Sequence, residues 1–306
     1  MSAINPSRTS TMPRNARAGV TTVAFAITSS GDMRGLRRPL VLKARPRENQ
    51  FGEARAPARR ALSLARTGDA GGRMAQNLDG FERYAVYFAP REGATLADLG
   101  ARWLGRDESG APVAPLDAPG LPAPRAALVR DAARYGFHAT LKAPFRLAEG
   151  VVGADLDHAV AALARARRSP SSLRLGVASL GGFVALSPSA SAPEVEALAA
   201  ACVIELDGLR APLTAGEAAR RGGAGLDAVE AANLVRWGYP YVLSRFRFHM
   251  TLTTRLSPTE AAQAVEALSA AFAPALDAPV AVEDLCLFGD PGGGAPLRLL
   301  RRHPLA

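Results

Sequence analysis

The sequence predicts an α+β fold, because strand and helix patterns are mixed along the chain and some strands form hairpins. Residues 173–186 hold two strand patterns around a Gly-Gly dipeptide, which is typical of a tight turn between antiparallel strands. A second strand pair lies within residues 280–302 around a glycine-rich turn. The order strand, helix and two strands occurs twice, at 136–186 and 245–302, which indicates an internal duplication.

The composition is that of a soluble globular protein, with 48% hydrophobic and 21% charged residues among 306. That length suffices for one large domain or two small ones. The net charge of +9 belongs to residues 1–80, which hold 14 Lys+Arg and 5 Asp+Glu, whereas the other 226 residues hold 23 of each. The body therefore lacks the basic surplus that binding of a long nucleic acid requires.

Residues 1–78 are predicted to form a disordered basic extension, because they are rich in Arg, Ser, Pro and Gly and poor in aromatic residues. Met74 offers an alternative start for the protein. The apolar residues 20–27 leave a targeting peptide open as an alternative, and a basic arm for nucleic acid is a second one.

The two cysteines, Cys202 and Cys286, lie far apart and outside any C-x-x-C pattern. We therefore expect neither a disulfide framework nor a zinc–thiolate site, and we predict a cytoplasmic protein. The sequence contains no run of 18 or more apolar residues, so no membrane partner is expected.

The elements of the body, residues 79–306, follow from side-chain periodicity, from turn residues, and from Ser or Thr caps with Glu three residues later. In chain order they are a strand at 83–88, a helix at 95–104, a loop at 107–124, a strand at 136–145, a helix at 155–168, the hairpin at 173–186, helices starting at Ser191, Thr214 and Ser257, a strand at 245–256, and the pair 280–288 with 296–302. The segment of about 207–240 is predicted to be a helical insert.

Two segments share a His-x-Thr pattern, Phe137-His138-Ala139-Thr140-Leu141 and Phe248-His249-Met250-Thr251-Leu252. Because side chains of a strand alternate between its faces, His and Thr of each segment share one face and the apolar side chains share the other. Two such faces side by side would make a pocket for a small phosphorylated group. The histidines can supply a general base and a general acid, since imidazole titrates near neutral pH. The hydroxyls of the threonines can donate hydrogen bonds to phosphate oxygens.

Three further side chains are predicted to bind the substrate. Lys142 and Arg247 follow the same alternation as the histidines, so they are expected to balance the charge of a phosphate. Tyr241, in the aromatic loop 237–242, offers a hydroxyl close to the second motif. Solvation of the two cations and packing of the loop are the alternatives.

A single His-x-Thr is weak evidence, because a strand histidine is more often a satisfied structural residue. The chain has only four histidines, however, and two of them share Phe before, Thr two residues after and Leu three residues after. No His-x-His or His-x-x-x-His occurs, and neither strand carries Asp or Glu on the face of its histidine. We therefore expect no metal and no cofactor.

The doubled motif resembles the 2H phosphoesterase superfamily, over approximately residues 81–306. The resemblance implies a two-lobed, pseudo-two-fold α+β fold with antiparallel sheets around a central groove. It also implies that His138 and His249 are the acid–base pair and that Thr140 and Thr251 hold the phosphate. Residues 135–145 and 237–252 are similar to a branch identified with phosphonate metabolism, whose genes accompany carbon–phosphorus lyase genes.

The predicted function is metal-independent hydrolysis of a cyclic phosphodiester on a small sugar phosphate, in phosphonate utilisation. The partner is then a small phosphorylated substrate. Processing of RNA ends that carry a 2′,3′-cyclic phosphate is the alternative enzymatic hypothesis, disfavoured by the neutral body. A phosphate-ligand binding module, in which the histidines only bind, is the non-enzymatic alternative.

Overall fold

The computed structural model describes residues 78–223 and 225–306. The chain divides into two units, residues 1–69 and 70–306, and all described residues belong to the second unit. Of the predicted N-terminal extension, residues 1–78, only Leu78 is therefore among the described residues.

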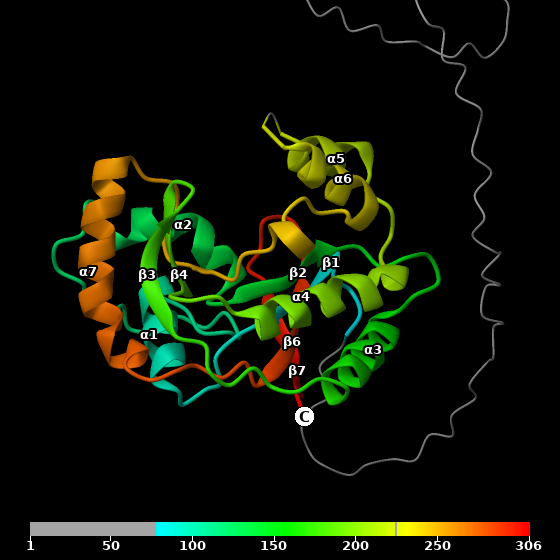
Figure 1. Ribbon diagram of the computed structural model, residues 1–306, viewed down its shortest axis with the longest axis horizontal. Helices are drawn as coiled ribbons and strands as arrows, with labels where there is room; N and C mark the ends of the chain where they lie inside the picture. The colour runs from blue at the N-terminus through cyan, green and yellow to red at the C-terminus, as the bar shows by residue number, and fades with distance from the viewer. Residues whose placement is uncertain (1–77, 224) are drawn as a thin grey trace, which may run out of the picture. The chain divides into compact units, whose positions relative to one another are not determined.

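One antiparallel sheet of seven strands crosses the described unit, in the order β3-β4-β5-β2-β1-β6-β7 (Figure 1). The α+β class is thus confirmed. The strands are β1 (Arg83–Phe88), β2 (Ala139–Phe145), β3 (Leu175–Leu180), β4 (Phe183–Pro188), β5 (Met250–Thr251), β6 (Asp284–Asp290) and β7 (Arg298–Pro304).

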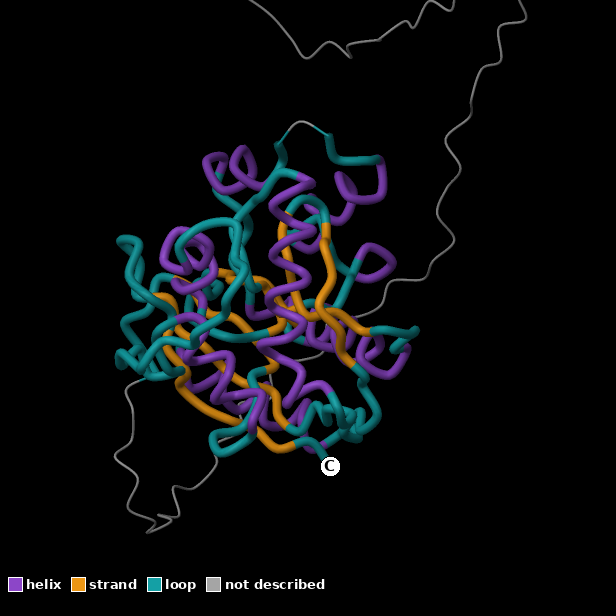
Figure 2. Tube along the Cα trace, turned by 90° about the vertical axis from the view of Figure 1, so that its left-hand side faces the viewer, coloured by secondary structure: helices purple, strands orange, loops and turns teal. Residues whose placement is uncertain are grey.

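Seven α-helices are described, and Figure 2 shows helices and strands side by side in a view turned by 90° from Figure 1. They are α1 (Thr95–Leu104), α2 (Arg125–Tyr135), α3 (Gly153–Arg165), α4 (Pro193–Glu205), α5 (Ala215–Arg221), α6 (Ala228–Trp237) and α7 (Pro258–Leu276). The short 3-10 helices η1 (Asp207–Leu209) and η2 (Leu243–Arg245) flank α5 and α6. None of the described helices is long and apolar enough to cross a membrane.

The two copies of the repeated pattern exchange their hairpins. In the first copy β2 is followed by α3 and the hairpin β3–β4, and in the second β5 is followed by α7 and the hairpin β6–β7. Helix α3 packs against β6 and β7, whereas α7 packs against β3 and β4. As a result β2 and β5 are neighbours in the interior of the sheet; the hairpin β3–β4 lies next to β5, and β1 separates β2 from the hairpin β6–β7.

The main core lies on the face of the sheet that α1, α3, α4 and α7 cover. Trp103 of α1 is fully buried there, and its indole nitrogen donates a hydrogen bond to the carbonyl of Leu252 at 2.7 Å. This bond anchors the chain just after β5, so the core fixes the position of the second His motif.

Several predicted elements are confirmed, including β1, α1 and the hairpin β3–β4. The predicted caps Thr214 and Ser257 each accept a hydrogen bond from the backbone of a glutamate three residues later. Ser191 was a wrong prediction, since Ala192 precedes α4 and no side chain caps it. Helix α2 is an additional element that the sequence patterns did not indicate.

The long strand predicted at 245–256 is wrong in extent, because only Met250–Thr251 forms β5. The residues before it include η2, where Leu243 adopts a positive φ of 54°, and an extended segment without ladder bonds. After β5 the amides of Leu252 and Thr253 both donate to the carbonyl of Val184, which ends the regular ladder. Likewise the predicted strand 136–145 begins only at Ala139.

Candidate active site

The two His motifs meet where β2 and β5 pair. Ala139 lies opposite Met250 in an antiparallel register, and both side chains are fully buried in the main core. Because neighbouring side chains point to opposite faces of a sheet, the residues on either side of this pair point away from the core. The register therefore places all four predicted histidine and threonine residues on one face.

In this register His138 lies across from Thr251, and Thr140 lies across from His249. Each histidine therefore has the threonine of the other motif as its cross-strand neighbour, with β-carbons about 5 Å apart, and the two histidines are diagonal neighbours. We call the face that bears these four residues the His face. The proximity of the rings also has an electrostatic consequence, because His249 contributes to lowering the pKa of His138.

Both imidazoles are held in the same way by the backbone. Nδ1 of His138 donates to the carbonyl of Gly136 at 2.9 Å, and Nδ1 of His249 donates to the carbonyl of Arg247 at 2.8 Å. A carbonyl only accepts, so Nδ1 carries the proton in each neutral ring and Nε2 has the free lone pair. Nε2 of His138 lies 3.2 Å from the hydroxyl of Thr140, which donates to it. In both residues Nε2 is therefore the ring nitrogen that does not face a backbone carbonyl.

His138 is set against aromatic side chains. Its ring stacks on Tyr87 of β1 at a centroid distance of 3.9 Å, and the ring of Tyr135 is 6.3 Å away. Burial lowers the pKa of His138 to about 4, and the cations of His249 and Arg106 add to this effect, against the hydrogen bond to Gly136. His138 is therefore neutral at pH 7 in the unliganded protein.

His249 has a different aromatic neighbour, which comes from the adjacent strand β4. The ring of Phe183 in β4 lies 5.6 Å from its centroid. Burial also lowers the pKa of His249, and the hydrogen bond to the carbonyl of Arg247 opposes that shift. The two histidines thus share their backbone support but differ in their aromatic surroundings.

Lys142 does not continue the His face. Tyr87 pairs with Thr140, but the register shifts so that Val86, on the other face of β1, pairs with Lys142. This β-bulge places one extra residue in β2 and turns Lys142 towards the core face. There its ammonium is 4% exposed and donates to the carbonyl of Val203 in α4 at 3.0 Å. The expected alternation through Lys142 is wrong for this reason, and its ammonium is engaged in the core.

Arg247 and Tyr241 lie closer to solvent. The side chain of Arg247 is exposed, and its guanidinium makes no hydrogen bond to another described residue. Tyr241 is 50% exposed, and its ring meets that of Tyr239 edge-on at 5.7 Å. The roles of both residues in substrate binding stay predictions.

Tyr87 and Tyr135 were not singled out from the sequence, although they surround His138. Tyr87 is almost completely buried, and burial first, then the nearby Tyr135 and Tyr239, raise its pKa well above the usual range. Its hydroxyl therefore stays protonated and can only be a neutral hydrogen-bonding group. The alternation of β1 could have indicated this position, but only once the pairing of β1 with β2 was known.

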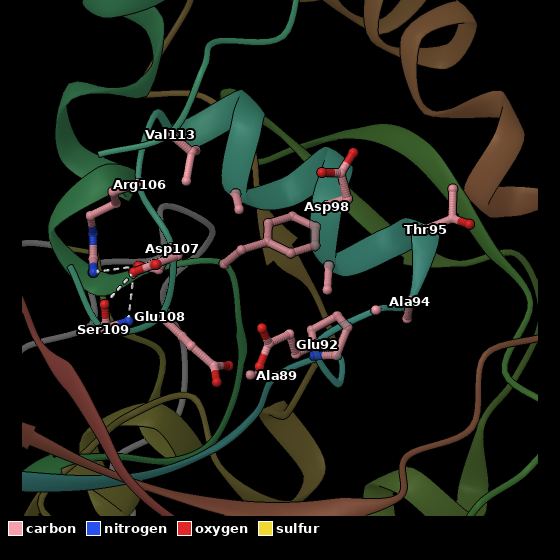
Figure 3. Close-up of a pocket in the computed structure, with 15 residues that line it drawn as sticks. Ala89, Glu92, Ala94, Thr95, Asp98, Arg106, Asp107, Glu108, Ser109 and Val113 are labelled. Carbon is pink, nitrogen blue, oxygen red and sulfur yellow. Dashed lines mark hydrogen bonds between the residues drawn. The ribbon is translucent and has the colours of Figure 1, made fainter. Parts of the chain in front are cut away.

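A cavity of about 670 Å³ lies beside α1, but neither histidine lines it. Figure 3 shows the carboxylates of Glu92, Asp98, Asp107 and Glu108 among its lining side chains. These acidic groups disfavour an anionic ligand, because like charges repel in a partly enclosed space. The cavity is therefore unsuited to a phosphorylated substrate, and we place the candidate site on the His face.

A metal centre has no support among the described residues. No group of three or more His, Cys, Asp or Glu side chains converges there in a way that could hold an ion. Cys202 and Cys286 are both buried and free, and burial raises the pKa of each thiol to about 12. The thiols are thus protonated at neutral pH.

Sheet order, register and paired imidazoles define a class of α+β protein with two His-x-Thr motifs side by side. The chain belongs to the family described as "Protein of unknown function (DUF1045)", which it matches over residues 140–298. The matched region contains Thr140 and the whole second motif, and it begins two residues after His138.

Two curated relatives carry the name "Ribose 1,5-bisphosphate phosphokinase PhnN". The protein from Janthinobacterium sp. (strain Marseille) is 41% identical over 230 residues, which are 73% of this chain and 51% of the relative. That from Laribacter hongkongensis (strain HLHK9) is 44% identical over 220 residues, which are 72% of this chain and 51% of the relative. The chain thus spans about half the length of these relatives.

Proposed function

We propose that this chain hydrolyses a cyclic phosphodiester on a small sugar phosphate, without a metal ion. The observation that carries the proposal is the antiparallel register of Ala139 and Met250, which gathers two histidines and two threonines on one face. The fixed Nδ1–H tautomers support it, since both Nε2 atoms are available for proton transfer. The two-lobed, pseudo-two-fold 2H phosphoesterase fold is part of the proposal, and the exchange of hairpins between the two copies supports it.

In the proposed reaction Nε2 of His138 accepts a proton from a water molecule as its oxygen attacks phosphorus. The bond between phosphorus and one ring oxygen of the cyclic ester breaks, and Nε2 of protonated His249 donates its proton to that oxygen. The products are a phosphomonoester and a free hydroxyl. Thr140 and Thr251 donate hydrogen bonds to non-bridging oxygens. We assign the base role to His138 because burial lowers its pKa to about 4, so it is neutral before substrate binds. Burial lowers the pKa of His249 as well, so its role as the acid requires that the negative charge of the bound phosphate favours the protonated ring.

Phosphonate utilisation is the proposed setting, through the resemblance to the phosphonate-metabolism branch. The relatives named for ribose 1,5-bisphosphate support a substrate of the sugar phosphate class. Their name also favours a second candidate function, phosphorylation of ribose 1,5-bisphosphate. The sequence argues against this second function. A phosphate-binding loop of the form G-x-x-x-x-G-K-[S/T] needs a lysine directly after a glycine. The 306 residues contain only two lysines, Lys43 and Lys142, and each follows a leucine. We therefore attribute phosphoryl transfer in the relatives to the half that this chain does not span.

The test is a turnover screen with ribose cyclic phosphates, nucleoside 2′,3′-cyclic phosphates and RNA ends, with and without EDTA. His138→Ala and His249→Ala should each lower kcat by roughly 10²- to 10⁴-fold, as expected of a positioned acid or base. The double variant should be little worse than either single one, because both groups act in one step. The pH–rate profile of the wild type should be bell-shaped, and activity should survive EDTA.

His158 provides a matched control, because it lies on α3 away from both motifs. His158→Ala should keep the wild-type rate. Full activity of a folded His138→Ala or His249→Ala variant would refute the catalytic roles. ATP-dependent phosphorylation of ribose 1,5-bisphosphate by this chain, without any hydrolysis of cyclic esters, would favour the phosphokinase function instead.

A further inference from the structure

Three arginines near this end of β1, Arg83, Arg134 and Arg221, have too few acidic partners. Arg83 and Tyr87 belong to the same strand and point to the same side, because Arg83 is four residues before Tyr87. Tyr87 pairs with Thr140, so this side is the His face. Ala85, the residue between them on this side, is fully buried against apolar neighbours that include Tyr87 and Phe288.

Arg83 and Arg134 share a single carboxylate. Asp290, which is fully buried, lies across from Arg83 and accepts from its Nε at 3.1 Å and its Nη2 at 2.5 Å. Arg134, in the last turn of α2, donates to the same carboxylate at 3.2 Å and 3.3 Å. The two arginine side chains remain 23% and 27% exposed, so an anion can approach them from solvent.

Arg221 is held by neutral groups only. Its guanidinium donates to the carbonyls of Gly238 and Pro144, each at 2.6 Å. Burial lowers its pKa, the carboxylate of Glu217 opposes the shift, and the guanidinium of Arg83 adds to it. Glu217 is itself bound to Arg146 by three hydrogen bonds within 3.3 Å. Arg221 is therefore a partly buried cation that lacks an ion-pair partner of its own among the described residues.

The position of Arg221 along the sheet can be derived from the register. Pro144 precedes Phe145, which pairs with Tyr84, so the guanidinium of Arg221 lies at the level of Ala85. Ala85 is two residues from Tyr87 and hence about 7 Å along the strand from the level of Thr140. Tyr239 lies beneath the guanidinium of Arg221, with its ring centroid at 5.8 Å.

We propose that Arg221, together with Arg83 and Arg134, forms a second anion subsite that binds a terminal phosphate of the substrate. The proposal rests on the proposed function and makes it more specific, since the substrate is then a sugar with a phosphate group at each end. One end lies at the histidines, and the other lies at the arginines, about one sugar away. Three guanidinium groups and one buried carboxylate leave a net positive charge, which a phosphomonoester compensates.

Helices α5 and α6 give the subsite its outer wall. Figure 1 shows them together above β1 and β2, and Arg221 is the last residue of α5. The loop after α6 supplies two of the contacts of that arginine, Gly238 and Tyr239. The helical segment thus places a cation over the sheet that the two His strands alone cannot provide.

The direct test is calorimetric binding of ribose 5-phosphate to the full chain, with ribose as the uncharged control. Arg221→Gln should weaken binding by about 10- to 100-fold, the usual effect of losing a charged hydrogen bond. Arg220→Gln is the matched control, because Arg220 is the neighbouring residue, is exposed, and carries the same charge. It should bind like the wild type. Arg221→Lys should recover only part of the affinity, since lysine lacks the planar fork.

The result is separable from the test of hydrolysis. If the subsite is correct, His249→Ala should bind ribose 5-phosphate like the wild type, even if no cyclic ester is ever turned over. Equal affinity of the wild type and Arg221→Gln, or a loss confined to His249→Ala, would overturn the subsite. For cyclic esters with and without a terminal phosphate, Arg221→Gln should lower kcat/KM only for the phosphorylated member. An equal loss for both esters, or no loss for either, would also overturn the proposal.

Discussion

Replacing Lys142 by methionine tests whether this lysine stabilises the core or contacts the substrate. Burial lowers the pKa of Lys142 from 10.5 to about 8, and the nearby carboxylate of Asp207 opposes the shift. Between these two pH values the unfolded chain holds a proton that the folded protein has lost. Stability must therefore rise with pH in this window, by about 3 kcal/mol in total. Below pH 8 both states are protonated, and the residue contributes no pH dependence.

At pH 7 two effects of Lys142→Met nearly cancel. The variant no longer buries an ammonium group, but it also loses the hydrogen bond to the carbonyl of Val203 in the last turn of α4. A charged hydrogen bond at a helix end contributes about 1.5–3 kcal/mol, which is similar to the cost of burying the charge. We expect the free energies of unfolding of the two proteins to differ by less than about 2 kcal/mol.

The assay is urea unfolding of both proteins at pH 7, 8.5 and 10, followed by circular dichroism. The wild type should gain stability relative to Lys142→Met as the pH rises, while other titrating groups cancel in the difference. A difference that stays constant with pH would refute the assigned burial of the ammonium. An intact fold with kcat/KM reduced at least about 100-fold would show that Lys142 acts on the substrate after all.

Two further predictions concern pH and thiols. The pKa of His138 is lowered from 6.5 to about 4, so between these pH values the unfolded chain binds a proton that the folded protein does not. The free energy of unfolding should therefore fall by at most about 3 kcal/mol as the pH drops from 6.5 to 4. His138→Gln should flatten that part of the pH dependence measured by urea unfolding. Cys202 and Cys286, with pKa values of about 12, should not react with a thiol reagent at pH 8 until urea unfolds the protein, and rapid labelling of the native chain would contradict their burial.

The prediction that the His and Thr of each motif share one face agrees with the register, because the alternation of a strand needs no knowledge of its partner. His138 and Thr140 flank Ala139, and the strand character there is enough to place them on one side. The prediction failed one step further, at Lys142, because a β-bulge depends on how β1 pairs with β2. No local pattern in the sequence of β2 reveals this shift of register.

The residues around the histidines were harder to predict than the histidines themselves. Tyr87 reaches His138 from β1, and Arg221 comes from α5, so both depend on long-range pairing and packing. The second His strand was predicted too long because its side-chain pattern continues beyond Met250–Thr251, whereas its backbone loses its ladder partners. Side-chain periodicity reports which face is buried, but it does not report how many amides find a partner.

Under the proposed function, the strand β1 explains how two equal motifs acquire unequal roles. An acid–base pair needs one protonated and one neutral ring, yet both histidines follow a phenylalanine, precede a threonine by two residues, and donate from Nδ1 to a backbone carbonyl. The difference comes from outside the duplication, because β1 has no counterpart in the second copy and brings Tyr87 to within 3.9 Å of His138 alone. The buried tyrosine removes water from that ring and favours its neutral form, whereas Phe183 lies farther from His249 at 5.6 Å. In this proposal β1 helps to keep His138 in the neutral form that a proton acceptor needs, and it also carries Arg83 of the second anion subsite.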